Sequence, residues 1–354
     1  MRKKYTSHFY NTSGFLTEHW YVACKSTDLK TKPKRSILFD IPLVIWRDSR
    51  KTPTVLLDRC CHRNAALSDG TVIGNNIKCP YHGWKFSNEG QCVNIPSEKN
   101  QNICKNFKVQ YFHCKEKFGL IWVWMGKDEP SEEIFQMPFR LGERGYQRYY
   151  MVTDFENNVT DLVENFLDVP HTVFVHKGWF RKEENIKVPI TVERIDDSVI
   201  VTYHQNDDKI GAFSKLLNPK NLPLIHTDKF YLPNITRVDY QFGIEREREF
   251  IITSVCSPVS EYFTRVYTLI TYNFKWLNPF IKLVLPWYTK KVITQDVEIM
   301  KNQGENLKTF KTKDYRSTQA DTLHIYVESL RDWEENGKIT DKPKDQKREC
   351  EIWI

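Results

Sequence analysis

The chain has 354 residues, of which 40% are apolar and 14% are aromatic, and 52 Lys and Arg against 45 Asp and Glu give a formal net charge of +7. This composition is typical of a globular protein of about two domains and excludes general disorder, which is poor in aromatic residues. Asn278, Pro279, Lys282 and Pro286 interrupt the longest apolar stretch, residues 276–288, so the sequence predicts no membrane-spanning helix.

The first residues and the cysteine count bear on the cellular compartment of the protein. Three basic residues, 2–4, are followed by polar residues where a signal peptide would need an apolar run. Nine cysteines are too few for a disulfide scaffold in a chain of this length, and their odd number favours reduced thiols or metal ligands. We therefore expect a cytoplasmic protein.

The first third of the chain resembles a small all-β domain. Its short β-rich runs are separated by turn signals such as Asp69-Gly70 and Asn88-Glu89-Gly90. The polar segment 127–133 ends this pattern, so we place the first domain at residues 15–128. The predicted strands are 20–23, 43–46, 55–57, 71–73 and 119–124.

The remainder, residues 129–354, is predicted to be an α+β domain. Apolar periodicity favours helices over 157–168 and 288–303, and strand-like runs occur at 188–204, 230–242 and 249–275. The charged end, residues 333–351, is interpreted as a solvated tail.

Charge is distributed unevenly between these two parts. Residues 1–128 hold 21 basic and 10 acidic side chains, a net charge of +11, whereas residues 129–354 hold 31 and 35, a net charge of −4. The basic residues are scattered among short strands and are not gathered on one helix or tail, so we do not expect nucleic acid as a partner.

Two loops of the first domain carry a metal-ligand pattern. Cys60 and His62 form C-x-H, and Cys79 and His82 form C-x2-H. Structural zinc usually takes its cysteines and its histidines from separate pairs, but here each loop offers one of each. This supply suits a [2Fe-2S] cluster in which one iron takes both cysteines and the other both histidines, the Rieske arrangement. Gly83 would permit close approach of the backbone to the cluster. Zinc and ordinary buried side chains are the alternatives.

A second pattern, D-x2-H-x4-H, is formed by Asp168, His171 and His176. Two histidines and one carboxylate on one face of Fe(II) make the facial triad of oxygen-activating enzymes. On a regular helix the two histidines would lie about 140° apart, so they could not share a metal. Pro170 supplies the necessary break. Ordinary polar residues of a helix and a loop are the alternative.

The third ligand is expected from the predicted helix at 288–303. Val292, Ile293, Ile299 and Met300 mark its apolar face, and Asp296 falls within that face. A buried carboxylate requires compensation, which a metal or a buried ion pair would provide. Asp168, by contrast, lies opposite the apolar face of its own helix; it is either a solvated surface residue or a residue with a partner elsewhere.

Together these motifs resemble the Rieske non-haem iron oxygenases. The resemblance rests on residues 57–86 and on Trp20-Tyr21-Val22-Ala23 and residues 90–96, and it extends over most of the chain. Cys61 stands where the family commonly has proline, and the spacing makes it a spacer between ligands. Ala65 and Tyr81 occupy the positions of the cysteine pair that clamps the respiratory Rieske proteins, so the cluster is more similar to the oxygenase type.

The resemblance implies a Rieske domain followed by a helix-grip (START-like) α+β catalytic domain, in a homotrimer of the monooxygenase-like branch. It implies cluster ligands Cys60, His62, Cys79 and His82 and iron ligands from the second domain. It places Asp168 at a subunit boundary, where Asp168 would link His82 of one chain to His171 of its neighbour. The iron ligands would be His171, His176 and Asp296.

The implied activity is that of a terminal oxygenase. A ferredoxin, or a flavin or iron–sulfur reductase, would pass electrons from NAD(P)H to the cluster and on to Fe(II), which would activate O2 for hydroxylation, demethylation or desaturation as a mono- or dioxygenase. Phe166, Phe174, Tyr231 and Phe242 are candidate pocket residues for an apolar or aromatic substrate. The basic first domain would dock an acidic donor, unless its lysines serve only solubility. The alternative function is a Rieske electron-transfer protein without oxygenase activity.

Overall fold

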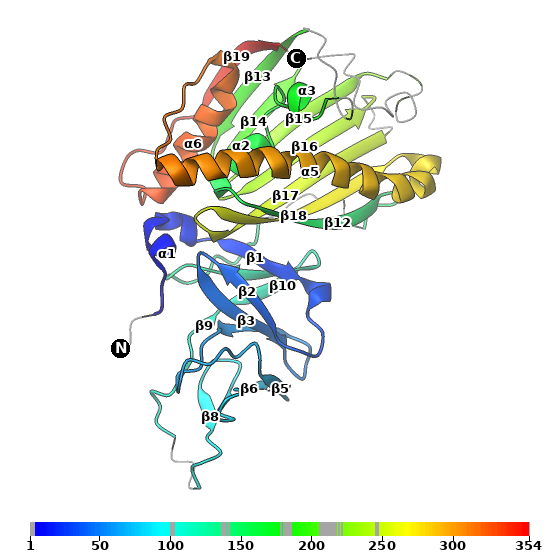
Figure 1. The fold of residues 1–354 in the computed structure, drawn as a ribbon. Coiled ribbons are helices and arrows are strands. Elements are labelled where there is room, and N and C mark those ends of the chain that lie inside the picture. Colours follow the sequence, from blue (N-terminus) through cyan, green and yellow to red (C-terminus); the bar gives the residue numbers. More distant parts are fainter. Residues whose placement is uncertain are drawn as a thin grey trace. The chain divides into compact units, whose positions relative to one another are not determined.

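The computed structural model describes residues 4–99, 103–135, 140, 142–177, 179, 186–204, 218, 220, 222–244 and 248–353. The chain forms two compact units, Met1–Ile134 (unit 1) and Phe135–Ile354 (unit 2). Unit 1 consists mainly of short strands, and unit 2 combines one large sheet with helices (Figure 1). The structure confirms the predicted order of an all-β domain followed by an α+β domain.

Unit 1 contains three small antiparallel sheets with the orders β1-β11-β10, β2-β3-β4-β9 and β5-β6-β7-β8. The sheets of unit 1 bury side chains in a shared hydrophobic core. Trp46, Val55 and Phe86 are fully buried in this core. A short helix, α1 (His8–Thr12), precedes the sheets. The strands are β1 (Trp20–Lys25), β2 (Lys34–Leu38), β3 (Ile41–Arg47), β4 (Pro53–Leu57), β5 (Thr71–Ile73), β6 (Asn76–Lys78), β7 (Lys85–Phe86), β8 (Cys92–Asn94), β9 (Tyr111–Phe112), β10 (Cys114–Lys117) and β11 (Leu120–Trp124).

Unit 2 is built on one antiparallel sheet of eight strands in the order β12-β18-β17-β16-β15-β14-β13-β19. Sequential hairpins account for most of this order, and alternation of buried and half-exposed residues along β14 and β15 shows that one face is covered. The strands are β12 (Gln147–Phe155), β13 (Lys187–Ile195), β14 (Ser198–Tyr203), β15 (Leu224–Tyr231), β16 (Ile235–Phe242), β17 (Arg248–Ser260), β18 (Phe263–Asn273) and β19 (Gln346–Trp353).

Helices cover the buried face of this sheet. The long helix α5 (Asn278–Phe310) crosses it, and α2 (Val159–Asn165), α3 (Thr172–Val175) and α6 (Thr322–Glu335) pack beside it (Figure 1). Leu162, Val163 and Leu330 from these helices are fully buried in the resulting core. None of the helices in the described parts of the chain has the length and apolar character required to cross a membrane.

The structure contradicts two predictions made from the sequence. The helix predicted at 288–303 is one part of α5, which begins ten residues earlier at Asn278 and contains Pro286. The segment 333–351 is not a solvated tail: it includes the end of α6 and most of β19, which pairs with β13. Cys350 and Ile352 of β19 are buried while their neighbours are exposed. The exposed, partly charged residues of this edge strand led the sequence analysis to predict a solvated tail.

Candidate functional site

Two loops of unit 1 carry the predicted cluster ligands. Cys60 and His62 follow β4, and Cys79 and His82 follow β6. The second loop turns back on itself through the 2.8 Å hydrogen bond that Cys79 N–H donates to the Trp84 carbonyl. Each loop therefore carries one of the two predicted cysteine ligands and one of the two predicted histidine ligands.

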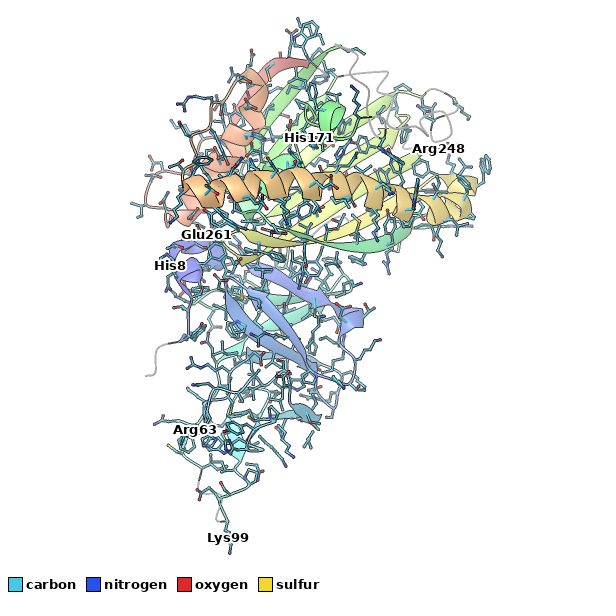
Figure 2. All side chains as sticks on the ribbon, viewed as in Figure 1. His8, Arg63, Lys99, His171, Arg248 and Glu261 are labelled. Carbon is cyan, nitrogen blue, oxygen red and sulfur yellow. The ribbon has the colours of Figure 1, made fainter. Side chains whose placement is uncertain are left out.

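Gly83 allows the second loop to make its turn. Its φ is +74°, and a Cβ added there would lie 3.1 Å from Pro96 Cγ. Both the left-handed backbone and the close neighbour exclude a larger residue without strain. Figure 2 labels Arg63, which follows His62 in the first loop and so locates that loop in unit 1.

The four side chains lie in two pairs, Cys60 beside Cys79 and His62 beside His82. Cys60 and Cys79 are 1% and 2% exposed, and the ring centroids of His62 and His82 lie 4.6 Å apart. Burial, together with the neighbouring Cys79 thiol, raises the pKa of Cys60 to about 12. Among the described residues His62 Nδ1 is buried without a hydrogen-bond partner. Buried thiols and an unpartnered imidazole nitrogen are groups that metal coordination satisfies, so this set fits a [2Fe-2S] cluster.

The second predicted site lies in unit 2. His171 precedes α3 and His176 follows it, because the chain breaks at Pro170 between α2 and α3. Asp296 reaches the same point from the buried face of α5. Figure 2 labels His171 beside the α3 turn. The structure therefore brings together the three residues that sequence reasoning selected as iron ligands.

The geometry of these three residues fits a metal ion. Asp296 Oδ1 lies 3.4 Å from His171 Nε2 and 3.2 Å from His176 Nε2. One ligand atom from each residue lies within 4.8 Å of the others. Adjacent ligand atoms on an octahedral ion about 2.1 Å away would be roughly 3 Å apart. His176 is 3% exposed and Asp296 is 5% exposed, so the site is shielded from solvent.

Charges in this site are tightly coupled. Burial lowers the pKa of His171, but the Asp168 and Asp296 carboxylates beside the ring outweigh that effect and raise the pKa to about 9. Burial raises the pKa of Asp296, but His171 and His176 outweigh it and lower the pKa to about 2. The metal-free site thus holds a carboxylate beside a protonated imidazole.

Iron binding is therefore expected to depend on pH. A metal at His171 must displace the proton held there, so the apparent affinity for Fe(II) should rise about tenfold per pH unit between pH 6 and 8 and level off near pH 9. Anaerobic titration of the apo-protein with Fe(II) over this range measures the effect. An affinity that does not change between pH 6 and 8 would show that His171 is neutral before metal binds.

Neighbouring amides orient the ligands. Asn165 Nδ2 donates to Asp296 Oδ1 at 3.3 Å, and His176 Nδ1 lies 3.1 Å from Gln295 Oε1. A proton on Nδ1 that is donated to Gln295 leaves Nε2 of His176 free to bind a metal. Sequence reasoning missed both amides. Gln295 stands next to Asp296 in the sequence, whereas nothing in the sequence indicates the contact of Asn165.

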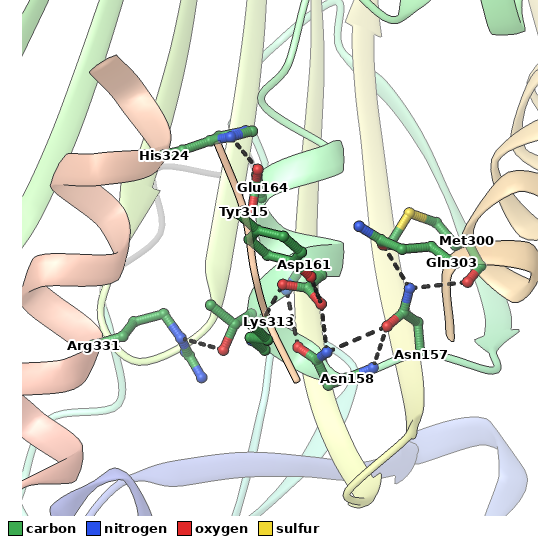
Figure 3. A network of polar contacts seen from close by, with 11 residues as sticks. Asn157, Asn158, Asp161, Glu164, Met300, Gln303, Lys313, Tyr315, His324 and Arg331 are labelled. Carbon is green, nitrogen blue, oxygen red and sulfur yellow. Dashed lines mark hydrogen bonds and ion pairs between the residues drawn. The ribbon is translucent and has the colours of Figure 1, made fainter. Parts of the chain in front are cut away.

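A polar network holds the ligand-bearing helices together (Figure 3). Asn157, which is fully buried, donates through Nδ2 to the Met300 carbonyl and to Gln303 Oε1 of α5, both at 2.9 Å. Glu164 of α2 forms an ion pair with His324 of α6. These contacts fix α2 against α5 and α6, and hence the segment that carries Asp168 and His171 against Asp296.

Asp168 does not join the three ligands directly. Its Oδ2 lies 3.5 Å from His171 Nδ1, on the opposite side of the ring from Asp296, and its side chain is 30% exposed. This position agrees with the prediction that Asp168 points away from the helix core. The carboxylate faces Nδ1 as an acceptor for its N–H, while Nε2 faces the metal position.

A cavity of about 140 Å³ adjoins the three ligands. The sheet forms one wall, from Met151 on β12 to Asp228 on β15, and α5 forms another. The lining is mainly apolar. A cavity with such a lining beside the metal position is a candidate binding site for a small organic molecule.

The predicted pocket residues are only partly correct. Phe166 lines the cavity. Phe174 is 66% exposed, Tyr231 contacts the Phe135 ring, and Phe242 packs against Phe274, so these three belong to the surface or the core. The sequence pattern marked them as apolar but could not indicate which face of a strand or helix meets the cavity.

Family models match both units. Residues 19–112 match the Rieske [2Fe-2S] domain, and residues 155–331, half of the chain, match the vanillate O-demethylase oxygenase C-terminal domain. The first match confirms the predicted [2Fe-2S] cluster over the zinc alternative. The second supports the mononuclear iron of an oxygenase domain.

Individual relatives agree with these models. The chain is 31% identical over 180 residues to aminopyrrolnitrin oxygenase PrnD of Pseudomonas fluorescens, which is 49% of this chain and 50% of that protein. It is 31% identical over 228 residues to the oxygenase component of dicamba O-demethylase of Stenotrophomonas maltophilia, which is 64% of this chain and 62% of that protein. The matches therefore span about half and about three fifths of these relatives.

A solved structure shares the fold over nearly the whole chain. Dicamba monooxygenase bound to dicamba is similar with a TM-score of 0.79 and 21% sequence identity, covering 92% of this chain and 99% of that one. The two-unit architecture, the metal-ligand sets and the two family matches lead to the same assignment. The chain belongs to the Rieske non-haem iron oxygenases, with a Rieske [2Fe-2S] domain followed by an oxygenase domain of the vanillate O-demethylase type.

Proposed function

We propose that this chain is the terminal oxygenase component of a Rieske system and oxidises a small, mainly apolar organic molecule. The observation that carries the proposal is the convergence of His171, His176 and Asp296 at the wall of an apolar cavity. A pure electron-transfer protein needs neither a second metal site nor a substrate cavity. The alternative function predicted from the sequence is therefore not favoured.

The proposed ligands form two sets, one for the cluster and one for the mononuclear iron. Cys60, His62, Cys79 and His82 would hold the cluster, and His171, His176 and Asp296 would hold an iron ion beside the cavity. Ferrous iron bound there supplies O2 activation with electrons from the cluster.

Neighbouring side chains orient two of the proposed iron ligands. Gln295 Oε1 would accept a hydrogen bond from a protonated His176 Nδ1, and Asn165 orients the Asp296 carboxylate. A mainly apolar lining would favour an apolar substrate over water in the cavity.

The proposed reaction is hydroxylation or oxidative demethylation. A substrate C–H bond becomes C–OH, the second oxygen atom leaves as water, and NAD(P)H supplies the electron pair through a reductase. Where the oxidised carbon is an O- or N-methyl group, the product then releases formaldehyde. The names of the relatives, an oxygenase and an O-demethylase, support this class of reaction.

The assembly and partners are also proposals. We propose a cytoplasmic homotrimer that receives electrons from a ferredoxin or a flavin or iron–sulfur reductase and does not bind nucleic acid. The net charge of +11 on residues 1–128 supports docking of an acidic donor on unit 1, and Lys78 beside the second cluster loop is exposed.

Metal analysis combined with turnover tests the proposal. We expect about three iron atoms and two acid-labile sulfides per chain, whereas an electron carrier would contain two of each. With a surrogate reductase and a panel of aromatic methyl ethers and N-methyl compounds, NAD(P)H and O2 consumption should rise together, and one atom from labelled O2 should enter the product. Two irons per chain, with a reducible cluster and no substrate-dependent O2 uptake, would contradict the oxygenase proposal.

A further inference from the structure

Strand β15 places an acidic side chain in the cavity wall. Along this strand Leu224, His226, Asp228 and Phe230 are buried, while the residues between them are half-exposed or exposed. Asp228 is 2% exposed and lines the same cavity as His171, His176 and Asp296. A carboxyl group in a largely apolar wall is costly unless it is hydrogen-bonded.

The protein satisfies this carboxyl group only in part. Tyr203 O–H donates to Asp228 Oδ2 at 2.9 Å, and His226 Nε2 lies 2.9 Å from Oδ1. Within the described ranges these are the only hydrogen-bond partners of Asp228. Because a carboxylate can accept about four hydrogen bonds, roughly half of its capacity is left for another molecule.

The acceptor is held rigidly. His226 is paired across the sheet with Tyr203 on one side and Tyr240 on the other. Its ring is stacked against both, with centroid separations of 4.3 Å and 4.4 Å. This stack holds the His226 imidazole in place, and the imidazole in turn holds the Asp228 carboxylate through their hydrogen bond. Asp228 is therefore a preorganised hydrogen-bond acceptor.

The charge of the cavity favours one class of substrate. Its described lining contains no lysine and no arginine, whereas Asp228 contributes a carboxylate away from the metal ligands. Away from the metal position, a substrate carboxylate or sulfonate would find no lysine or arginine to pair with, and Asp228 would repel it in this low-dielectric space. An N–H or O–H group would complete the hydrogen bonding of Asp228.

Resting on the proposed oxygenase function, we infer that Asp228 determines specificity: it binds an N–H or O–H group of the substrate. The cavity then takes neutral or cationic small aromatic molecules that carry an amine, amide or hydroxyl group, and it rejects carboxylates and sulfonates.

Four matched probes test the inference on the holoenzyme: 4-methoxybenzylamine, 4-methoxybenzyl alcohol, 4-methoxytoluene and 4-methoxybenzoate. Dissociation constants are measured by calorimetry, and O-demethylation is measured by formaldehyde release. The amine and the alcohol should bind roughly 10- to 100-fold more tightly than the toluene, and the benzoate should bind most weakly. In Asp228→Asn the ratio of amine to benzoate affinity should fall by a similar factor.

Asp239→Asn is the matched control. Asp239 lies on the neighbouring strand β16, where its carboxylate binds Lys229 and Arg237 and does not line the cavity. This variant should keep the wild-type order of affinities. If Asp228→Asn does not fold, the order of affinities in the wild type still tests the inference, and Tyr203→Phe provides a milder change at the same carboxylate.

Two outcomes would overturn the inference: benzoate binding more tightly than the alcohol to the wild type, or an unchanged ratio of amine to benzoate affinity in Asp228→Asn. Failure of the proposed function would look different. In that case the expected order of affinities would be observed while none of the bound probes released formaldehyde. Demethylation of the benzoate in preference to the amine would instead leave the oxygenase function intact and reject the role of Asp228.

Discussion

Replacing Cys79 by alanine is expected to abolish the visible absorbance of unit 1 and to destabilise its fold. Cys79 is 2% exposed within the core of the unit, and the free energy of metal binding in such a site is folding free energy. Iron content should fall from about three to about one atom per chain, and labile sulfide should disappear. Absorbance, electron paramagnetic resonance and thermal unfolding measure these effects together.

Cys61→Ala provides the matched control. Cys61 is a half-buried neighbour of two proposed ligands, yet its spacing excludes it from the ligand set. This variant should retain the rhombic Rieske signal and the full sulfide content. A Cys79→Ala protein that kept a complete Rieske signal would rule out Cys79 as a ligand.

The parts of the site that could be predicted from the sequence are those encoded by short spacing. Cys60 and His62, and likewise Cys79 and His82, lie within single loops, so the sequence alone shows that they can converge on one cluster. His171 and His176 could be paired because Pro170 signals the break between them. Asp296 could be added because helical periodicity places it on the buried face of α5.

The contacts that escaped prediction depend on tertiary structure. Asn165 reaches Asp296 across 131 positions of the sequence, and Asp228 enters the cavity only because of the register of β15 within the sheet. A shift of one residue would turn Asp228 to the other face. Single-sequence patterns carry no information about such register.

The two fold errors have a similar physical origin. The helix was predicted only over 288–303, whereas α5 begins at Asn278: Pro279 occupies its first turn, where no backbone donor is lost, and Pro286 is accommodated inside it. Strand β19 was not recognised because half of its residues are charged and six of its eight residues are exposed at the edge of the sheet. Pairing with β13, which a local pattern cannot show, defines it as a strand.

The Asp168→Asn variant is expected to retain both metal centres and lose turnover by about 100-fold or more. The carboxylate lies 3.5 Å from His171 Nδ1, and an amide preserves its shape while removing the negative charge that stabilises the proton on that nitrogen. In the proposed trimer the same carboxylate would also contact His82 of the neighbouring chain, so its loss would slow electron transfer to the iron. Single-turnover reoxidation of the reduced cluster by O2, with substrate present, measures that step directly.

Asp154→Asn and His176→Ala separate this role from general effects. Asp154 pairs with Arg265 at the surface, so its substitution should leave turnover unchanged. His176→Ala should lose the mononuclear iron and keep the cluster, because His176 is a proposed ligand and Asp168 is not. If Asp168→Asn reoxidises its cluster at the wild-type rate, the carboxylate has no part in the path between the metals. Its contact with His171 would then serve only to hold the imidazole in place.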